Sequence, residues 1–173
     1  MVNEASIVRE LHDEMSIRAV LLRYCRGIDR CDAELLRSCY HEDAFDDHGP
    51  FKGGRDDLVE YSIAQLRGRT ESHGQVTSHL IGNVLIERDG DVARVESYFK
   101  ASHVEDRADH FRVFEFNGRY VDRFERRNGE WRIGRREVIH DWSEIRNHRR
   151  GLVPGRHDYA QGTIFPDDAI YQR

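Results

Sequence analysis

The chain has 173 residues, of which 34% are charged, and its two signs of charge nearly balance at a net charge of −5. This length most simply gives one domain with room for an internal pocket. The charge balance offers no electrostatic basis for nucleic-acid binding. No segment is apolar over the length of a membrane span, and the first residues are too acidic for a signal peptide. We therefore expect a cytoplasmic protein with no membrane partner.

The three cysteines form no C-x-x-C pair. An odd number of cysteines fits the reduced thiols of a cytoplasmic protein better than a disulfide framework. We expect Cys25, Cys31 and Cys39 to behave as small buried hydrophobic residues.

Apolar residues recur at helical spacing from about residue 5 to residue 27. This spacing predicts one long helix, or two helices joined near His12. Gly27 weakens the helix and predicts its end, which places Asp29 in the following connector. Asp32 then predicts the cap of a short helix over residues 33–40.

The next segment is predicted to hold a short strand at residues 44–47, ended by His48-Gly49-Pro50. Two glycines at 53–54 precede a predicted helix over residues 56–67, which begins with two aspartates where the helix dipole favours anions. The polar residues 68–74 predict a loop.

The clearest hairpin lies at residues 77–99. An Asp-Gly pair at 89–90 supplies the positive φ of a tight turn between two alternating arms. On the first arm, His79 shares its parity with Ile81 and Asn83, and such a half-apolar face lines either a cavity floor or a core.

A charged turn is predicted within residues 101–109, and a long strand follows over residues 110–127. Asn128-Gly129 predicts a second tight hairpin turn, and the last strand runs to about Trp142. We expect residues 1–142 to form the domain. Residues 143–173 are expected to form a tail without clear period that covers the pocket, wraps a neighbouring subunit or is loosely ordered.

Helices followed by about four long antiparallel strands indicate an α+β domain with helices packed on one face of a curved sheet. A strongly bent sheet with N-terminal helices across its concave side makes a cone with a cavity inside. Such a cavity is the default ligand site.

Several short motifs in this order resemble the nuclear transport factor 2-like superfamily, in particular its SnoaL-like branch with scytalone dehydratase, hexachlorocyclohexane dehydrochlorinase and bile-acid dehydratase. The motifs are Tyr24-Cys-Arg-Gly-Ile-Asp29, His79 with Ile81-x-Asn83, Gly90-Asp91-x-Ala93, Gly118-x-Tyr120-x-Asp122, and Gly129-x-Trp131 with Arg136. The resemblance spans roughly residues 14–142. It implies the cone-shaped α+β barrel of that superfamily and a trimer or dimer.

The resemblance also implies that Asp29 and His79 form a catalytic pair. A neutral imidazole is a competent proton acceptor, and a carboxylate on its other nitrogen fixes the tautomer, so His79 would be the base and Asp29 its orienter. Tyr24 would donate to a substrate oxygen or protonate a departing hydroxyl, and Arg136 would stabilise developing negative charge. Tyr24 and Asp29 would point about 140° apart on an unbroken helix. The expected break at Gly27 would bring them together.

We expect His140, Asn83, Tyr98 and Phe116 to bind the substrate. Ordinary structural roles compete with each catalytic assignment: a helix-end carboxylate, a hydrogen-bonded sheet histidine, a core aromatic residue and a solvated arginine.

An iron site built from His103-x-Glu105 with His110 or His140 is a further alternative. It is disfavoured because the charged segment that holds most of these residues is expected to be exposed to solvent. We therefore expect no metal.

The resulting functional prediction is a cofactor-independent lyase, dehydratase-like, or an isomerase acting on a small apolar cyclic substrate. The alternative is a non-catalytic ligand-binding or assembly module, similar to the small subunits of ring-hydroxylating dioxygenases. Exposed aromatic residues on the sheet favour a homo-oligomer in either case.

Overall fold

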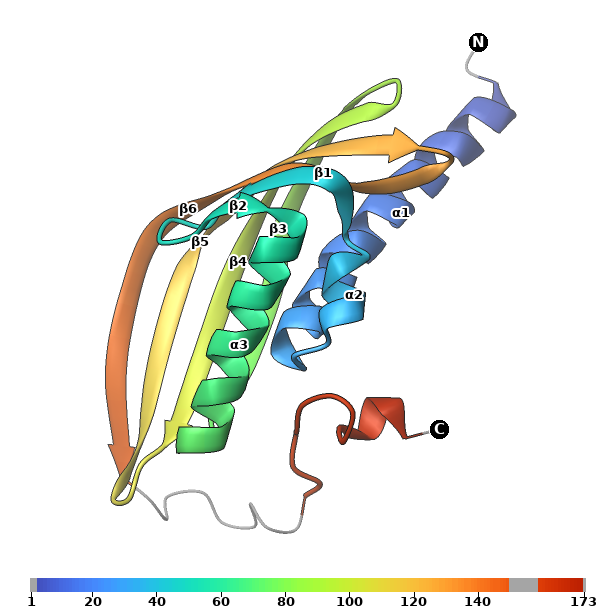
Figure 1. Ribbon diagram of the computed structural model, residues 1–173. Coiled ribbons are helices and arrows are strands. Elements are labelled where there is room, and N and C mark those ends of the chain that lie inside the picture. Colours follow the sequence, from blue (N-terminus) through green and yellow to red (C-terminus); the bar gives the residue numbers. More distant parts are fainter. Residues whose placement is uncertain (1–2, 150–158, 173) are drawn as a thin grey trace.

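The computed structural model describes residues 3–149 and 159–172. It has the predicted α+β architecture, in which a six-stranded curved sheet carries helices across its concave face (Figure 1). In the described part of the chain, no helix has the length and apolar character needed to cross a membrane.

The first helix, α1 (Glu4–Asp29), is a single unbroken helix, and the side chain of Asn3 caps its first turn. The predicted break at Gly27 is wrong, because this glycine serves close packing against α2 (Ala33–Arg37). A Cβ atom at position 27 would lie only 2.9 Å from the backbone nitrogen of Leu36. The helix therefore continues to Asp29.

The other helices begin within one residue of their predicted starts and differ at their ends, and α2 ends at Arg37 rather than at residue 40. Asp32 caps α2 by accepting a hydrogen bond from the backbone N–H of Leu35 at 3.0 Å. The third helix, α3 (Arg55–His73), continues through the predicted loop and ends at Gly74, whose φ of 55° is the left-handed conformation that favours glycine.

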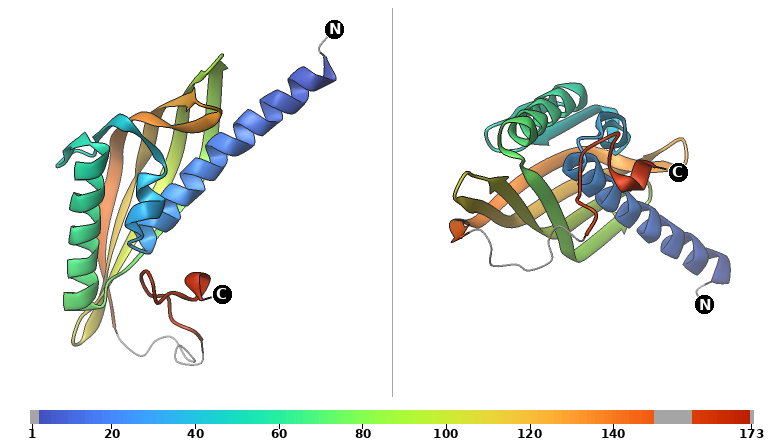
Figure 2. Two further views of the ribbon diagram at one scale, coloured as in Figure 1. Left: turned by 45° about the vertical axis from the view of Figure 1, so that its right-hand side comes forward. Right: turned by 90° about the horizontal axis from the view of Figure 1, so that it is seen from below.

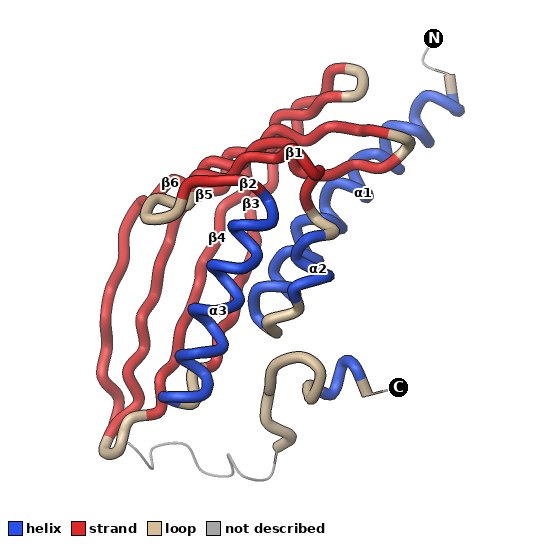
Figure 3. The backbone as a smooth tube through the Cα atoms, in the orientation of Figure 1, coloured by secondary structure: helices blue, strands red, loops and turns tan. Residues whose placement is uncertain are grey.

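The sheet has the strand order β2-β1-β6-β5-β4-β3. All neighbouring strands are antiparallel except the parallel pair β1 and β6. Because β2 and β3 remain edge strands, the curved sheet does not close into a barrel (Figure 3). The strands are β1 (Tyr40–Asp47), β2 (Lys52–Gly54), β3 (Val76–Asp89), β4 (Val92–Asp106), β5 (His110–Arg127) and β6 (Glu130–Arg149).

Both predicted hairpin turns are present. Gly90 has a φ of 58°, and Asn128 and Gly129 have φ values of 54° and 85°. The predicted charged turn is much shorter than expected, because β4 continues to Asp106 and only three residues connect it to β5. The last strand likewise continues to Arg149, seven residues beyond its predicted end.

A β-bulge interrupts the first arm of the β3–β4 hairpin. The register shifts between Gly82 and Val84, and Asn83 adopts a φ of 49°. One extra residue exchanges the two faces of a strand. Ile81 before the bulge and Val84 after it consequently both pack against the core. The prediction that Asn83 continues the face of His79 is therefore wrong.

A second irregularity bends β5 against β6 between Asn117 and Gly118. A Cβ atom at position 118 would lie 2.0 Å from the carbonyl oxygen of Ile139. Only glycine permits this close approach of the two backbones.

Helices α1 and α3 lie across the same face of the sheet, and the first turns of α1 extend beyond it (Figure 2). The C-terminal residues 159–172, with the short 3-10 helix η2 (Ala169–Tyr171), lie beside the C-terminal end of α1. Residues 150–158 of the predicted tail lie outside the described residues.

Candidate active site

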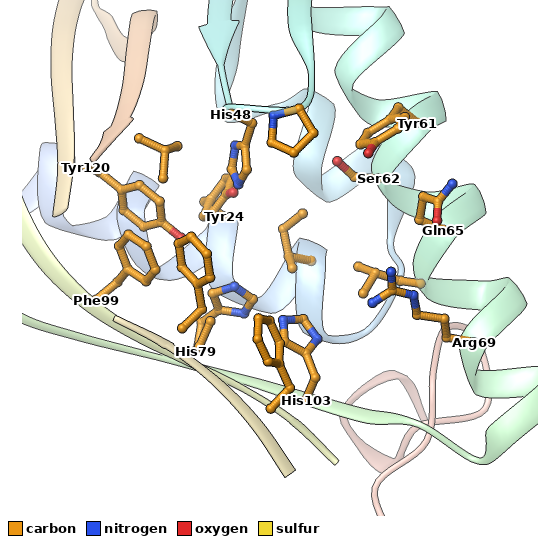
Figure 4. A pocket seen from close by; sticks show the side chains of 17 residues that line it. Tyr24, His48, Tyr61, Ser62, Gln65, Arg69, His79, Phe99, His103 and Tyr120 are labelled. Atoms are coloured by element: carbon orange, nitrogen blue, oxygen red, sulfur yellow. The ribbon is translucent and has the colours of Figure 1, made fainter. Parts of the chain in front are cut away.

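A cavity of about 290 Å³ lies between the concave face of the sheet and the helices (Figure 4). Its wall is mostly apolar and aromatic, with a small number of polar side chains that converge on the same space. The apolar part of the wall includes Ile28, Leu66, Phe99, Phe114, Phe116 and Val138. This composition is typical of small-molecule sites.

Asp29 and His79 are in direct contact at this cavity. The Nδ1 atom of His79 lies 2.6 Å from Asp29 Oδ1, and the backbone N–H of His79 donates to Asp29 Oδ2 at 2.9 Å. The side chains are only 14% and 8% exposed for Asp29 and His79. One carboxylate thus fixes both the ring and the backbone of the strand residue.

This contact follows from two local features. Asp29 is the last residue of α1, and His79 is on the inward face of β3, ahead of the bulge. If the carboxylate is ionised, it accepts the proton on Nδ1, and the lone pair of the ring then resides on Nε2. His79 lines the cavity, whereas Asp29 lies behind it.

Tyr24 also lines the cavity, on the same side of α1 as Ile28. On the unbroken helix, Tyr24 and Asp29 point in different directions. Tyr24 faces the cavity directly, whereas Asp29 reaches the site through its contact with His79. Tyr24 is 1% exposed, and burial raises its pKa above the ordinary value. It is therefore a hydrogen-bond donor rather than a phenolate at neutral pH.

Arg136 does not line the cavity. Its guanidinium group is fully buried, donates two hydrogen bonds of 2.7 Å to Asp122, and lies 4.2 Å and 4.0 Å from the ring centroids of Tyr24 and Tyr120. Burial acts to lower the pKa of Arg136, but Asp122 outweighs it and keeps that pKa above its ordinary value. Arg136 was expected to place a cation in the pocket. It is instead paired with Asp122 and lies behind the ring of Tyr24.

Of the four predicted binding residues, only Phe116 lines the cavity. Asn83 is exposed in the bulge, and Tyr98 is 44% exposed because the inward face of β4 belongs to the residues on either side of it. His140 is exposed, and its ring touches Phe116 with centroids 4.5 Å apart. These three side chains thus lie outside the wall of the described cavity.

His103 also lines the cavity. The sequence patterns had placed it only in the alternative iron site. Its ring is nearly perpendicular to that of His79, with centroids 6.1 Å apart. Nδ1 lies 3.3 Å from Thr77 Oγ1 and 3.4 Å from Gln75 Nε2, both of which can donate to it, so the ring proton resides on Nε2. Burial, with smaller effects of His79 and Arg69, lowers the pKa of His103 to about 4.

One sequence signal would have identified His103. The buried alternation of Val95, Phe99 and Ala101 continues in step to residue 103. The predicted strand ended too early because charged residues surround His103. Contrary to expectation, the segment is strand, and Glu105 pairs with Arg107.

His48 is the second missed cavity residue. It follows β1 in the connection to β2, and its Nδ1 lies 3.0 Å from the buried carboxylate of Asp46. The sequence predicted only that His48 breaks a strand, because no periodicity reports on the direction of a side chain in a turn.

The C-terminal residues contact the end of α1 close to Asp29. The backbone N–H of Phe165 donates to the carbonyl oxygen of Arg30 at 2.6 Å, and Arg30 forms an ion pair with Asp168 at 3.3 Å. A smaller hollow of about 210 Å³, lined among others by Asp29 and Ile164, lies between this segment and the end of α1.

A curved open sheet with N-terminal helices over its concave face is the arrangement of the nuclear transport factor 2-like class of α+β domains. Residues 9–137 match the model of the SnoaL-like domain, and the chain belongs to this family. The search of curated proteins finds no match.

Three solved structures illustrate the similarity. A protein of unknown function from Mycobacterium tuberculosis is 29% identical, with 78% of this chain and 75% of that chain covered and a TM-score of 0.64. A candidate scytalone dehydratase from Novosphingobium aromaticivorans is 22% identical, with 83% and 97% covered and a TM-score of 0.63. A type 2 hexachlorocyclohexane dehydrochlorinase is 16% identical, with 87% and 99% covered and a TM-score of 0.69.

Proposed function

We propose that the protein is a cofactor-independent lyase, dehydratase-like in its chemistry, that acts on a small apolar cyclic substrate. One observation carries this proposal: Asp29 holds the His79 ring at 2.6 Å on the wall of an apolar cavity. The similarity in fold to named dehydratase and dehydrochlorinase structures is consistent with it.

In the proposed reaction, His79 Nε2 removes a proton from a carbon adjacent to an electron-withdrawing group. Asp29 stabilises the imidazolium that forms, because its carboxylate already accepts the Nδ1 proton. The mostly apolar wall excludes water and strengthens this electrostatic interaction. The electrons of the broken C–H bond form the new double bond as the leaving group departs.

Neighbouring side chains have supporting roles in this proposal. Tyr24 and the neutral ring of His103 donate hydrogen bonds to a substrate oxygen, which stabilises an enolate-like transition state. Arg136 acts as a positioning residue, since it holds the ring of Tyr24 against the cavity. Substrate selection follows from the cavity, whose size and aromatic wall favour a small ring compound.

The test uses 3-acetoxycyclohexanone, which contains an acidic C–H bond and a leaving group that needs no protonation. We expect the wild-type protein to release cyclohexenone, measured by its ultraviolet absorbance. The variant His79→Ala should be slower by about 10²–10⁴-fold with unchanged circular dichroism.

The matched control is His12→Ala, which removes an exposed histidine from the first part of α1 and should retain the wild-type rate. Activity retained in His79→Ala, or a wild-type rate equal to that in buffer, would reject the lyase proposal.

The second candidate function is an assembly module. Large apolar side chains lie exposed on the outer face of the sheet, among them Leu80, Leu85 and Trp142. We propose that this face forms a homo-oligomer, a dimer or trimer. Light scattering on the purified chain tests this proposal, and we expect a dimer or trimer. A subunit that assembles only with a larger partner would instead remain a monomer or aggregate.

A further inference from the structure

The cavity contains a second carboxylate–imidazole pair, formed by Asp46 and His48. The Nδ1 atom of His48 lies 3.0 Å from Asp46 Oδ1, and the hydroxyl group of Tyr40 donates to Asp46 Oδ2 at 2.8 Å. Asp46 is 1% exposed, so this carboxylate is held in place by its two partners. The pair has the same organisation as Asp29 and His79.

The two histidines reach the cavity from opposite edges of the sheet. His48 follows β1 and precedes β2, which are the strands at one edge, whereas His79 lies on β3 at the other edge. Curvature of the sheet brings both edges around the same space, and the two rings lie on different sides of it (Figure 4). A substrate in the cavity therefore lies between two imidazoles, each with one nitrogen fixed by a carboxylate.

The two histidines differ in their access to water. The side chain of His48 is 35% exposed, whereas that of His79 is 8% exposed. Contact with solvent allows a ring to regain a proton after each turnover, whereas a shielded ring exchanges protons less readily with bulk water. These properties suit a proton donor at His48 and a proton acceptor at His79.

We propose that His48 is the general acid that protonates the departing oxygen in the elimination that His79 begins. This inference rests on the function proposed above. His79 takes the proton from carbon, and the electrons of that C–H bond form the C=C bond. The C–O bond breaks with its electrons on oxygen, and His48 Nε2 gives its proton to that oxygen. Water leaves, and the two rings return to their starting states by exchange with solvent.

The other cavity donors fit this role less well. Burial raises the pKa of Tyr24, which makes it a weak acid. His103 has a pKa of about 4 and is neutral at neutral pH, so it has no ionic proton to give. His48 is thus better suited than Tyr24 or His103 to release a hydroxide as water.

The kinetic test compares 3-hydroxycyclohexanone with 3-acetoxycyclohexanone. Both probes offer the same C–H bond, but only hydroxide needs a proton to depart. We expect His48→Gln to slow loss of water by about 10²–10³-fold and loss of acetate by less than about threefold. His79→Gln should slow both reactions.

The outcomes separate the two proposals. Equal effects of His48→Gln on both probes, or no effect on loss of water, would overturn the acid role while the lyase proposal stands. Loss of acetate unaffected by His79→Gln would overturn the lyase proposal and, with it, the acid role.

A binding test needs no turnover and uses 1-indanol and indane, which differ by one hydroxyl group. The side-chain ¹⁵N signals of His48 should shift with 1-indanol and not with indane. His48→Gln should weaken 1-indanol binding by about tenfold, as expected for one hydrogen bond. Its affinity for indane should be unchanged, which also shows that the variant is folded. An unchanged affinity for 1-indanol would contradict the proposal.

Discussion

At the scale of single residues, Asp29 has two separate functions in one carboxylate. One oxygen contacts the ring of His79 and the other accepts from the backbone N–H of the same residue. The orientation of the imidazole is therefore coupled to the position of β3 against α1. A residue with a single acceptor oxygen cannot satisfy both contacts.

The variant Asp29→Asn tests this coupling. The backbone N–H requires the amide oxygen of asparagine, so the amide NH₂ group would face Nδ1 of His79. The ring would then carry its proton on Nε2 and lose its basic nitrogen in the cavity. We expect acetate elimination to slow by about 10²–10⁴-fold.

The ¹⁵N chemical shifts of His79 report the tautomer in this variant. Asp89→Asn, an exposed substitution near the tip of the hairpin, should leave the rate and the His79 signals unchanged. A His79 ring that keeps its Nδ1 proton in Asp29→Asn would contradict the interpretation.

His103 predicts a specific loss of stability in acid. Its folded-state pKa is lowered from 6.5 to about 4, mainly by burial. As the pH falls below 6.5, the unfolded chain takes up this proton before the folded chain does, so stability is lost between pH 6.5 and pH 4. Between pH 6.5 and pH 5 the loss should be about 1–2 kcal/mol.

Urea unfolding at several pH values measures this loss. The free energy of unfolding of His103→Gln should fall less steeply with decreasing pH than that of the wild type. The exposed control His12→Gln should retain the wild-type slope. Identical slopes for His103→Gln and the wild type would show that His103 titrates normally.

At the scale of secondary-structure elements, two helical glycines offer a matched pair. Gly27 in α1 lies against α2, where a Cβ atom would be 2.9 Å from the backbone of Leu36, whereas Gly68 in α3 has no atom within 4 Å of the same position. Gly27→Ala should lower the free energy of unfolding by about 1–3 kcal/mol, because the two helices must separate.

Gly68→Ala should raise the free energy of unfolding by about 0.5–1 kcal/mol, because alanine is the better helix former. Thermal and urea unfolding measure both variants. An equal change in the free energy of unfolding for the two variants would show that the effect of Gly27→Ala comes from helix propensity rather than from packing against α2.

The sequence predicted these elements most accurately where the determining interactions are local. Asp32 as a helix cap and the turns at Gly90 and Asn128-Gly129 are confirmed, because each depends on a few adjacent residues. The ends of α3, β4 and β6 were placed too early, because polar residues interrupt the apolar pattern there although the elements continue. The bulge at Asn83 could not be predicted from alternation alone.

At the scale of the whole molecule, the site is assembled from segments that are distant in the chain. The family resemblance identified Asp29 and His79 from sequence motifs, and the structure brings them together. His48 and His103 join them only through the curvature of the sheet, which the linear pattern does not report. Arg136 was assigned to the cavity by the family resemblance, and no sequence pattern indicated its pairing with Asp122.

The C-terminal residues connect this assembly to the end of α1. Asp168 accepts hydrogen bonds from the backbone N–H groups of Thr163 and Ile170 and pairs with Arg30. We propose that this segment shields the outer side of the catalytic pair. Asp168→Ala should release it, so that the amides of Thr163 and Ile170 exchange with solvent at least about tenfold faster, as expected for the loss of about 1.4 kcal/mol.

Hydrogen exchange measured by NMR tests this prediction. The neighbouring substitution Asp167→Ala removes an exposed carboxylate and should leave the exchange rates unchanged. Acetate elimination should also be slower in Asp168→Ala if the segment shields Asp29. Faster exchange at a wild-type elimination rate would assign the segment to stability alone.

The close approach at Gly118 has a practical consequence for altering substrate range. Because a side chain at this position would collide with the carbonyl oxygen of Ile139, this point of the β5–β6 pair tolerates no larger residue. Redesign for bulkier compounds should therefore leave Gly118 untouched and trim the neighbouring wall residues Phe114 or Phe116. The cavity would then gain space while the close contact between β5 and β6 at Gly118 is kept.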